Sequence, residues 1–92
     1  MEKVLKAQNS KDNSTRYSLI ESEIQFDSEK ALTYGIRIES LISDTKSKKQ
    51  KMSEILDITT KYEEVKALFD KVVDLEITPM LLKDVAEDFI NS

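Results

Sequence analysis

The clearest pattern along this chain is an alternation of apolar and polar residues between positions 31 and 42. Its apolar side is formed by Leu32, Tyr34, Ile36 and Ile38, and its other side by Thr33, Gly35 and Arg37. A period of two is typical of a β-strand that buries one face. We therefore expect a strand over residues 31–42.

A second segment with strand character covers residues 15–26. Tyr17 and Leu19 share one parity, whereas Ile20, Ile24 and Phe26 share the other. This change of parity predicts a bulge or bend near Leu19 and Ile20. The polar residues 27–30 fit a turn, so the two segments together predict a β-hairpin.

The segments on either side of this hairpin are less regular. Residues 51–58 favour a third strand, with a short helix as the alternative, after a polar loop at 43–51. Residues 1–13 are polar, with Val4 and Leu5 as the large aliphatic residues. We expect these first residues to form a disordered lead.

The last third of the chain has helical spacing. The first predicted helix covers residues 60–75, and its apolar positions are Val65, Leu68, Phe69, Val72 and Val73. Thr60 and Glu63 fit a capping box at its start. The second predicted helix covers residues 79–91, with Thr78 as N-cap and Pro79 at the first helical position. Its apolar positions are Leu81, Leu82, Val85, Ala86, Phe89 and Ile90.

These elements predict a single small α+β domain over residues 14–92. Its three strands, at about 15–26, 31–42 and 51–58, form an antiparallel meander, and both helices pack on one face of this sheet.

The amino-acid composition limits the catalytic and ligand-binding groups that this chain can supply. The chain has no histidine, no cysteine, one glycine and one proline. It therefore lacks an imidazole base, a thiol nucleophile, a disulfide and a glycine-rich phosphate loop. We expect a protein that is not an enzyme, with no cofactor and no metal site. No apolar run reaches the length of a membrane span and the N-terminus has no signal-peptide pattern, so we expect a cytoplasmic protein.

Charge is unevenly distributed. Residues 1–52 carry ten Lys/Arg and eight Asp/Glu, a net of +2, whereas residues 53–92 carry four and ten, a net of −6. Asp84, Glu87 and Asp88 share one face of the last predicted helix, towards its C-terminal end, where the helix dipole disfavours negative charge. This acidic face is a candidate contact for a basic protein partner, although acidic residues there are also compatible with plain solubility.

Two other places are candidate contacts. Gly35 interrupts the strongest strand, which indicates either a local bulge or close packing against its backbone, or the close approach of a ligand or partner. Together with Tyr34 and Arg37 it marks a sheet edge or open face where a partner strand is a candidate contact. The basic cluster Lys46, Lys48, Lys49 and Lys51 is a weaker candidate for nucleic-acid contact, because no aromatic residue is interleaved and the net charge of −4 argues against direct nucleic-acid binding.

Three short stretches carry a resemblance. Residues 33–36 (TYGI), 55–59 (ILDIT) and 78–89 (TPMLLKDVAEDF) resemble a family of small uncharacterised proteins of clostridia and related Gram-positive bacteria. The resemblance implies a whole domain over about residues 15–91 in a bacterial cytoplasm, and it carries over no catalytic residue.

Three hypotheses of function follow. The leading one is a small non-enzymatic regulatory or adaptor protein that binds another protein. The second is an accessory factor of a DNA transaction, acting on a recombinase or transcription regulator. The third is a structural homodimer formed through the open sheet face or the sheet edges.

Overall fold

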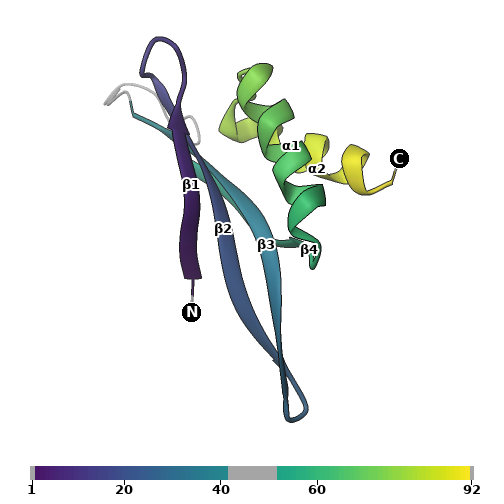
Figure 1. Cartoon of the computed structure of the whole chain (residues 1–92). Helices are drawn as coiled ribbons and strands as arrows, with labels where there is room; N and C mark the ends of the chain where they lie inside the picture. Colours follow the sequence, from purple (N-terminus) through teal and green to yellow (C-terminus); the bar gives the residue numbers. More distant parts are fainter. Residues whose placement is uncertain (1, 42–51, 92) are drawn as a thin grey trace.

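The computed structural model describes residues 2–41 and 52–91 of the chain. Its elements are β1 (Glu2–Asn9), β2 (Thr15–Phe26), β3 (Glu29–Ser40), β4 (Met52–Thr59), α1 (Tyr62–Asp74), the 3-10 turn η1 (Pro79–Leu81) and α2 (Leu82–Ile90). The four strands form one antiparallel sheet in the order β1-β2-β3-β4, and both helices lie on one side of it (Figure 1). The predicted α+β class and the two helices on one face are confirmed.

The predicted number of strands was wrong, because residues 2–9 form β1 and are not part of a disordered lead. Every residue of β1 is exposed. Its order comes from backbone pairing with β2, in a register that runs from Glu2 opposite Ser22 to Asn9 opposite Arg16. A strand held by main-chain hydrogen bonds needs no apolar alternation, so the hydrophobic pattern did not indicate it.

The turn between β1 and β2 is built by short polar side chains. Asp12 Oδ1 accepts hydrogen bonds from the hydroxyls of Ser10 at 2.8 Å and Ser14 at 2.6 Å, and from the Ser14 amide at 3.0 Å. These bonds, with that of the Ser14 hydroxyl the strongest, lower the pKa of Asp12 from 3.8 to about 2. Asn13 takes the left-handed conformation that the turn requires, with φ 58°. The hydrogen bonds of the turn therefore favour the ionised carboxylate of Asp12.

The remaining strands lie close to their predicted positions. β2 has the predicted bounds, and residues 52–59 form a strand, as predicted, and not the alternative short helix. Of the predicted bulge or bend near Leu19 and Ile20, a bulge within β2 was wrong, because β2 pairs with β3 without interruption from Thr15 opposite Ser40 to Phe26 opposite Glu29. The irregularity lies in β1, between Val4 and Lys6, opposite Leu19 and Ile20.

The hydrophobic core lies between the sheet and the helices. It contains Tyr17, Leu19, Ile36, Ile38, Val65, Leu68, Phe69, Val72, Leu82 and Ala86. α1 packs across β2, β3 and β4, and α2 packs against β4. The predicted apolar face of the first helix is confirmed, whereas Leu81 and Ile90 of the second are 46% and 56% exposed. The core is thus mainly a contact between β2, β3 and α1.

The helix ends differ in detail from the predicted ones. The capping box of Thr60 and Glu63 was wrong, since Lys61 is the N-cap of α1. The Thr59 hydroxyl instead accepts a bond from the Lys61 amide at 3.1 Å and donates to Glu64 Oε1 at 2.7 Å. Pro79 occupies the first helical position after Thr78 as predicted, but it begins a 3-10 turn, and the Thr78 side chain makes no cap bond. The first α-helical residue is therefore Leu82.

The C-terminal end of α1 adopts a Schellman motif. The Ile77 amide donates to the Val72 carbonyl at 3.0 Å, and the Glu76 amide to the Val73 carbonyl at 3.1 Å. Glu76 has φ 50°, a left-handed conformation for which glycine is the usual residue. Backbone strain is therefore present at Glu76.

Candidate functional site on the open face and the hairpin arm

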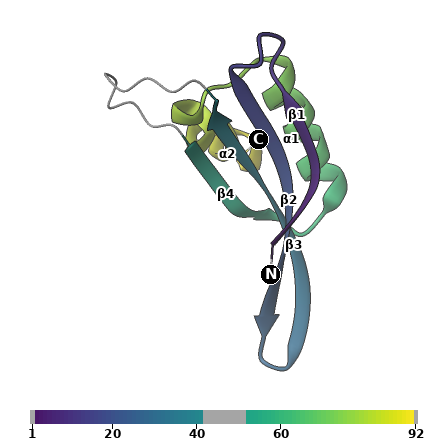
Figure 2. The same ribbon diagram turned by 90° about the vertical axis from the view of Figure 1, so that its left-hand side faces the viewer.

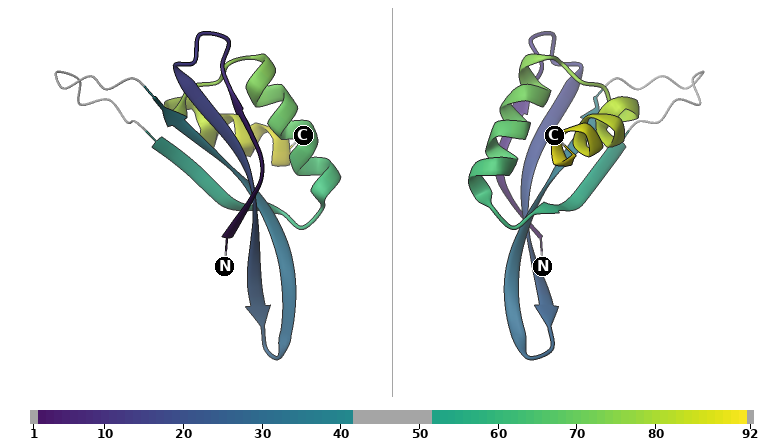
Figure 3. Two further views of the ribbon diagram at one scale, coloured as in Figure 1. Left: turned by 60° about the vertical axis from the view of Figure 1, so that its left-hand side comes forward. Right: turned by 90° about the vertical axis from the view of Figure 1, so that its right-hand side faces the viewer.

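The helices leave one face of the sheet uncovered, which we call the open face (Figure 3). Strand alternation places Ser18 and Ile20 of β2 on this face, because Tyr17 and Leu19 point into the core on the other. Ile20 is fully buried although no helix covers it. Other parts of the chain therefore cover the open face around Ile20.

Gly35 lies directly opposite Ile20 in the sheet and is covered by β4. The register of β3 with β4 shifts between Tyr34, which pairs with Thr59, and Ile36, which pairs with Ile55. Two extra residues of β4 thus bulge out opposite Gly35. A Cβ atom on Gly35 would lie 2.0 Å from the Ile55 carbonyl oxygen and 2.4 Å from Leu56 Cα. The glycine is needed because the backbone of β4 occupies the place of a side chain.

Thr33 fastens the bulged part of β4. Its hydroxyl lies within hydrogen-bond distance of Asp57 Oδ1, and it also lies 3.2 Å from the Thr59 carbonyl oxygen. Thr33 is 1% exposed. The pair Thr33 and Gly35 therefore lets β4 cross close to β3 before the chain turns into α1.

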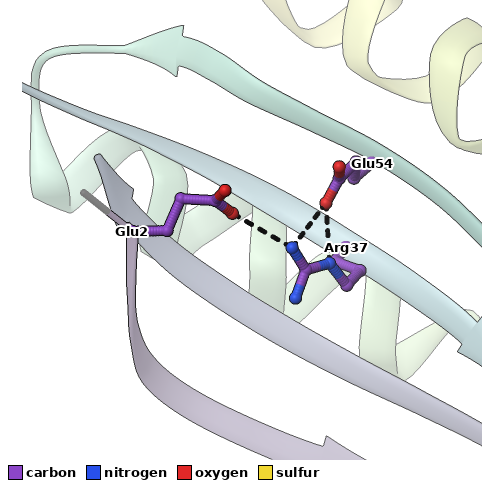
Figure 4. Close-up of polar contacts among 3 residues, drawn as sticks. All are labelled: Glu2, Arg37 and Glu54. Atoms are coloured by element: carbon purple, nitrogen blue, oxygen red, sulfur yellow. Dashed lines mark hydrogen bonds and ion pairs between the residues drawn. The ribbon is translucent and has the colours of Figure 1, made fainter. Parts of the chain in front are cut away.

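Arg37 is the central charged group of the open face. Its Nε donates to Glu54 Oε2 at 2.7 Å, and its Nη2 lies 2.6 Å from Glu54 Oε2 and 3.0 Å from Glu2 Oε1 (Figure 4). The hydrogen bond to Glu54 raises the pKa of the guanidinium above its ordinary value. Two carboxylates thus surround one cation, and Arg37 has no spare charge for an anionic ligand.

The Arg37–Glu2 ion pair crosses β2 at the level of Ile20. In the register, Ile20 lies between Val4 of β1 and Gly35 of β3. Glu2 and Arg37 stand two residues from these neighbours, on opposite sides, so the line that joins them passes over Ile20. The ion pair thus lies over the same part of β2 as Ile20, next to the β4 backbone that covers Gly35 on this face.

A shallow depression lies beside Arg37 on the open face. It has a volume of about 550 Å³, and its lining residues are Val4, Ala7, Asn9, Arg16, Ser18, Arg37 and Glu39. Arg16 donates weakly to Asn9 Oδ1 at 3.4 Å. The described residues around it include no nucleophile paired with a base, and no part of the described chain gathers three side chains able to hold a metal ion. The depression offers a polar surface and no catalytic arrangement.

The residues predicted as contacts are not brought together. Tyr34 lies on the helix side, where its ring meets that of Tyr62 edge-on at 5.7 Å, and Arg37 lies on the open face. β3 is flanked by β2 and β4 at these positions, so Tyr34, Gly35 and Arg37 offer no free strand edge. Lys46, Lys48, Lys49 and Lys51 lie outside the described residues.

The acidic residues of α2 are exposed and lie on the helix side, away from Arg37. Asp84 lies in the first turn of α2, not towards its C-terminal end, because the α-helix begins at Leu82. The helix dipole favours a carboxylate at this place. Glu87 and Asp88 remain near the C-terminal end, so only these two oppose the dipole.

One candidate contact was not singled out from the sequence. Pairing of β1 with β2 starts at Ser22, and pairing of β4 with β3 starts at Tyr34. Residues 23–32, which we call the arm, therefore form a two-stranded hairpin that extends beyond the rest of the sheet (Figure 2). A sequence signal for the arm was available, since two predicted strands of twelve residues are followed by a third of only eight.

No described side chain of the arm belongs to the core, and most of them are exposed. Asp27 and Ser28 form its two-residue turn, with Asp27 at φ 53°. Glu23, Asp27 and Glu29 are exposed, Leu32 is 45% exposed, and Lys30 Nζ lies 3.4 Å from Glu23 Oε1. With three carboxylates and one lysine, the arm has a net charge of −2.

Comparisons with known proteins give a family and no function. No helix in the described ranges has the length and apolar character needed to cross a membrane. No curated protein and no solved structure matches the chain. The model of a family of unknown function, DUF6514, matches residues 1–92. The chain therefore belongs to the family DUF6514.

Proposed function

We propose that this chain is a small non-enzymatic regulatory or adaptor protein that acts by binding another protein through its arm. The observation that carries the proposal is the projection of residues 23–32 beyond both β1 and β4. A two-stranded hairpin without a third strand or a helix against it is only marginally stable in water. The arm is therefore the part of the sheet that gains most from a partner.

The length of β2 and β3 also supports binding through the arm. Each has twelve residues, about twice the mean strand length of 5–6 residues. The core side chains of these strands are Tyr17, Leu19, Ile36 and Ile38, so the core uses only the halves distant from the turn. No described core side chain comes from the arm, which supports recognition as its role.

The resemblance to proteins of clostridia and related bacteria supports a cytoplasmic setting in a Gram-positive bacterium as part of the proposal. The leading alternative surface is the acidic face of α2, formed by Asp84, Glu87 and Asp88. It lies on the helix side of the sheet, so the two surfaces are separable by experiment (Figure 1).

Site-specific photo-crosslinking tests the proposal. A photoreactive residue replaces Gln25 on the arm in one variant and Lys83 beside Asp84 in the other, and each variant is expressed in the native cell. We expect one discrete crosslinked protein with the arm variant and none with the α2 variant. A crosslink from position 83 alone, or none from either position, would contradict binding through the arm.

A further inference from the structure

β1 forms one edge of the sheet, and no described strand pairs with its outer side (Figure 1). All eight of its residues are exposed, and they include two large aliphatic ones, Val4 at 51% and Leu5 at 37%. An exposed edge strand presents a row of unpaired N–H and C=O groups to which another strand can add. The outer side of β1 is therefore a candidate interface.

The hydrogen-bond pattern shows which residues of β1 direct their main chain outward. The Ser10 amide donates to the Thr15 carbonyl at 2.8 Å, which marks a bonded pair at one end of the β1–β2 ladder. Bonded pairs alternate along an antiparallel ladder, so the β1 residues opposite Tyr17, Leu19 and Glu21 also bond to β2. The other paired residues of β1 direct their N–H and C=O groups away from the sheet, and they are Glu2, Val4, Ala7 and Asn9.

The irregularity at Leu5 determines which strand fits this edge. Outward groups recur at every second residue of a regular strand, but in β1 two residues separate Val4 from Ala7. A regular strand therefore matches only one half of β1, which is how a bulge protects an edge. A second copy of β1 has the same interruption. When two copies run antiparallel with Glu2 opposite Asn9, every outward residue faces an outward residue, and every other antiparallel register matches at most half of them.

Charges in this register are compatible with pairing. Lys3 lies opposite Gln8 of the other copy, and no two like charges stand directly opposite each other. Gln8 lines a hollow of about 410 Å³ beside α1, whose charged groups are Asp70, Asp74 and one lysine. Asp70 pairs with Lys66 at 3.1 Å, whereas no ion pair among the described residues includes Asp74 or Lys3. Directly opposed residues share a face of a sheet, so Lys3 of the other copy enters this hollow beside Asp74.

We propose that two copies of this chain pair antiparallel through β1, with Glu2 of each copy opposite Asn9 of the other. The two four-stranded sheets then form one continuous sheet about a twofold axis. The inference goes beyond the proposed function and does not depend on it, because no residue of the arm takes part. A contact of one strand from each copy is small, so we expect a dissociation constant of about 10–100 μM.

Disulfide trapping tests the register, because the chain has no cysteine of its own. Val4→Cys and Ala7→Cys are purified separately, and each is oxidised alone and in an equal mixture at about 0.2 mM. In the proposed register, position 4 of one copy lies opposite position 7 of the other, with Cβ atoms about 4.5–5.5 Å apart. Two copies of the same position lie about 10 Å apart. We therefore expect the mixture to form a disulfide-linked dimer at least about fivefold faster than either variant alone.

Sedimentation equilibrium of the full chain measures the dissociation constant, and variants locate the contact. Ala7→Pro removes an outward N–H without breaking a bond to β2, and we expect it to weaken the dimer at least about tenfold. Asp74→Lys places like charge beside Lys3 of the other copy and should weaken the dimer about fivefold relative to Asp84→Lys, which makes the same change on α2. Lys3→Glu added to Asp74→Lys should restore the affinity, which a merely unfolded chain cannot do.

Three results would overturn the inference. The first is a chain that sediments as a monomer up to about 0.5 mM. The second is a dimer whose affinity neither Ala7→Pro nor Asp74→Lys changes, which would place the contact on another surface. The third is disulfide formation by either cysteine variant alone as fast as by the mixture, which would reject the register. None of these results bears on a crosslink from position 25 of the arm, so the proposed function stands or fails separately.

Discussion

Replacement of Gly35 by alanine tests the packing of β4 over β3. In an open strand this change is stabilising by about 0.5–1 kcal/mol, because glycine has more conformational freedom to lose on folding. Here the new Cβ would lie 2.0, 2.4 and 2.6 Å from the Ile55 carbonyl oxygen, Leu56 Cα and the Leu56 carbonyl carbon. All three atoms belong to the backbone, so no side-chain rotation relieves the overlap.

The expected cost follows from the movement that this overlap requires. Carbon atoms normally approach to about 3.5–4.0 Å, so β4 must move away by more than about 1 Å. Overpacking of this kind costs about 1–3 kcal/mol. Displacing β4 also weakens the two contacts of the Thr33 hydroxyl, at about 1 kcal/mol each. After the gain from alanine is subtracted, we expect the free energy of unfolding to fall by about 2–4 kcal/mol.

Urea and thermal unfolding followed by circular dichroism measure this change. For a domain of this size, 1 kcal/mol corresponds to about 4–8 °C in Tm, so Gly35→Ala should lower Tm by about 10–25 °C. Thr33→Val is the matched control, because it removes the hydrogen bonds without adding the overlap, and it should cost about half as much. An unchanged or raised Tm for Gly35→Ala would refute the close approach of β4.

Three further predictions concern single positions. Glu76→Gly should stabilise the chain by about 0.5–1 kcal/mol, because glycine adopts the left-handed conformation at the end of α1 without strain, whereas Glu76→Ala keeps the strain and should give no gain in urea unfolding. Folding lowers the pKa of Asp12, so its contribution to stability is full above about pH 4 and is lost as the pH falls through about 2. Asp12→Asn should therefore flatten the dependence of Tm on pH in that window, and an unchanged profile would contradict the turn geometry. Arg37→Ala should lower the free energy of unfolding by about 1–2 kcal/mol, by uncovering Ile20 and leaving Glu2 and Glu54 without their cation. Arg37→Met keeps the apolar cover and should lower it less. Equal losses in the two variants would show that the arginine stem does not cover Ile20.

Elements with a buried side were predictable from the sequence. β2 was placed at its observed bounds, and the apolar face of α1 was identified, because burial imposes a period that the residues themselves display. Pro79 likewise marks its own position, since it lacks the N–H that an interior helical position would need.

Elements held by the backbone were not predictable in the same way. β1 has no buried side chain and forms because its main chain pairs with β2. The N-cap of α1 is Lys61 and not Thr60, because β4 continues one residue beyond its predicted end and the helix starts later. Glycine at position 35 was identified as unusual, but only the structure shows that β4 covers it.

For the candidate sites, too, the sequence indicated single residues but not the contacts that pairing of distant strands creates. Sequence patterns located charged groups such as Arg37, but not its partners Glu2 and Glu54, which come from other strands. The ion pair between Arg37 and Glu2 joins β3 to β1 across β2, and β1 itself was not predicted. The arm was missed because exposed strand ends carry weak patterns, and the difference in strand length was its only sign.

The most direct test of the central claim is the affinity of the partner captured from position 25 for a chain without its arm. Residues 23–32 are replaced by Asn-Gly, which closes Ser22 and Thr33 into a new two-residue turn. We predict that Tm changes by less than about 5 °C, because no described side chain of the arm belongs to the core, while affinity for the partner falls at least about tenfold. Unchanged affinity in the folded, shortened chain would contradict recognition through the arm.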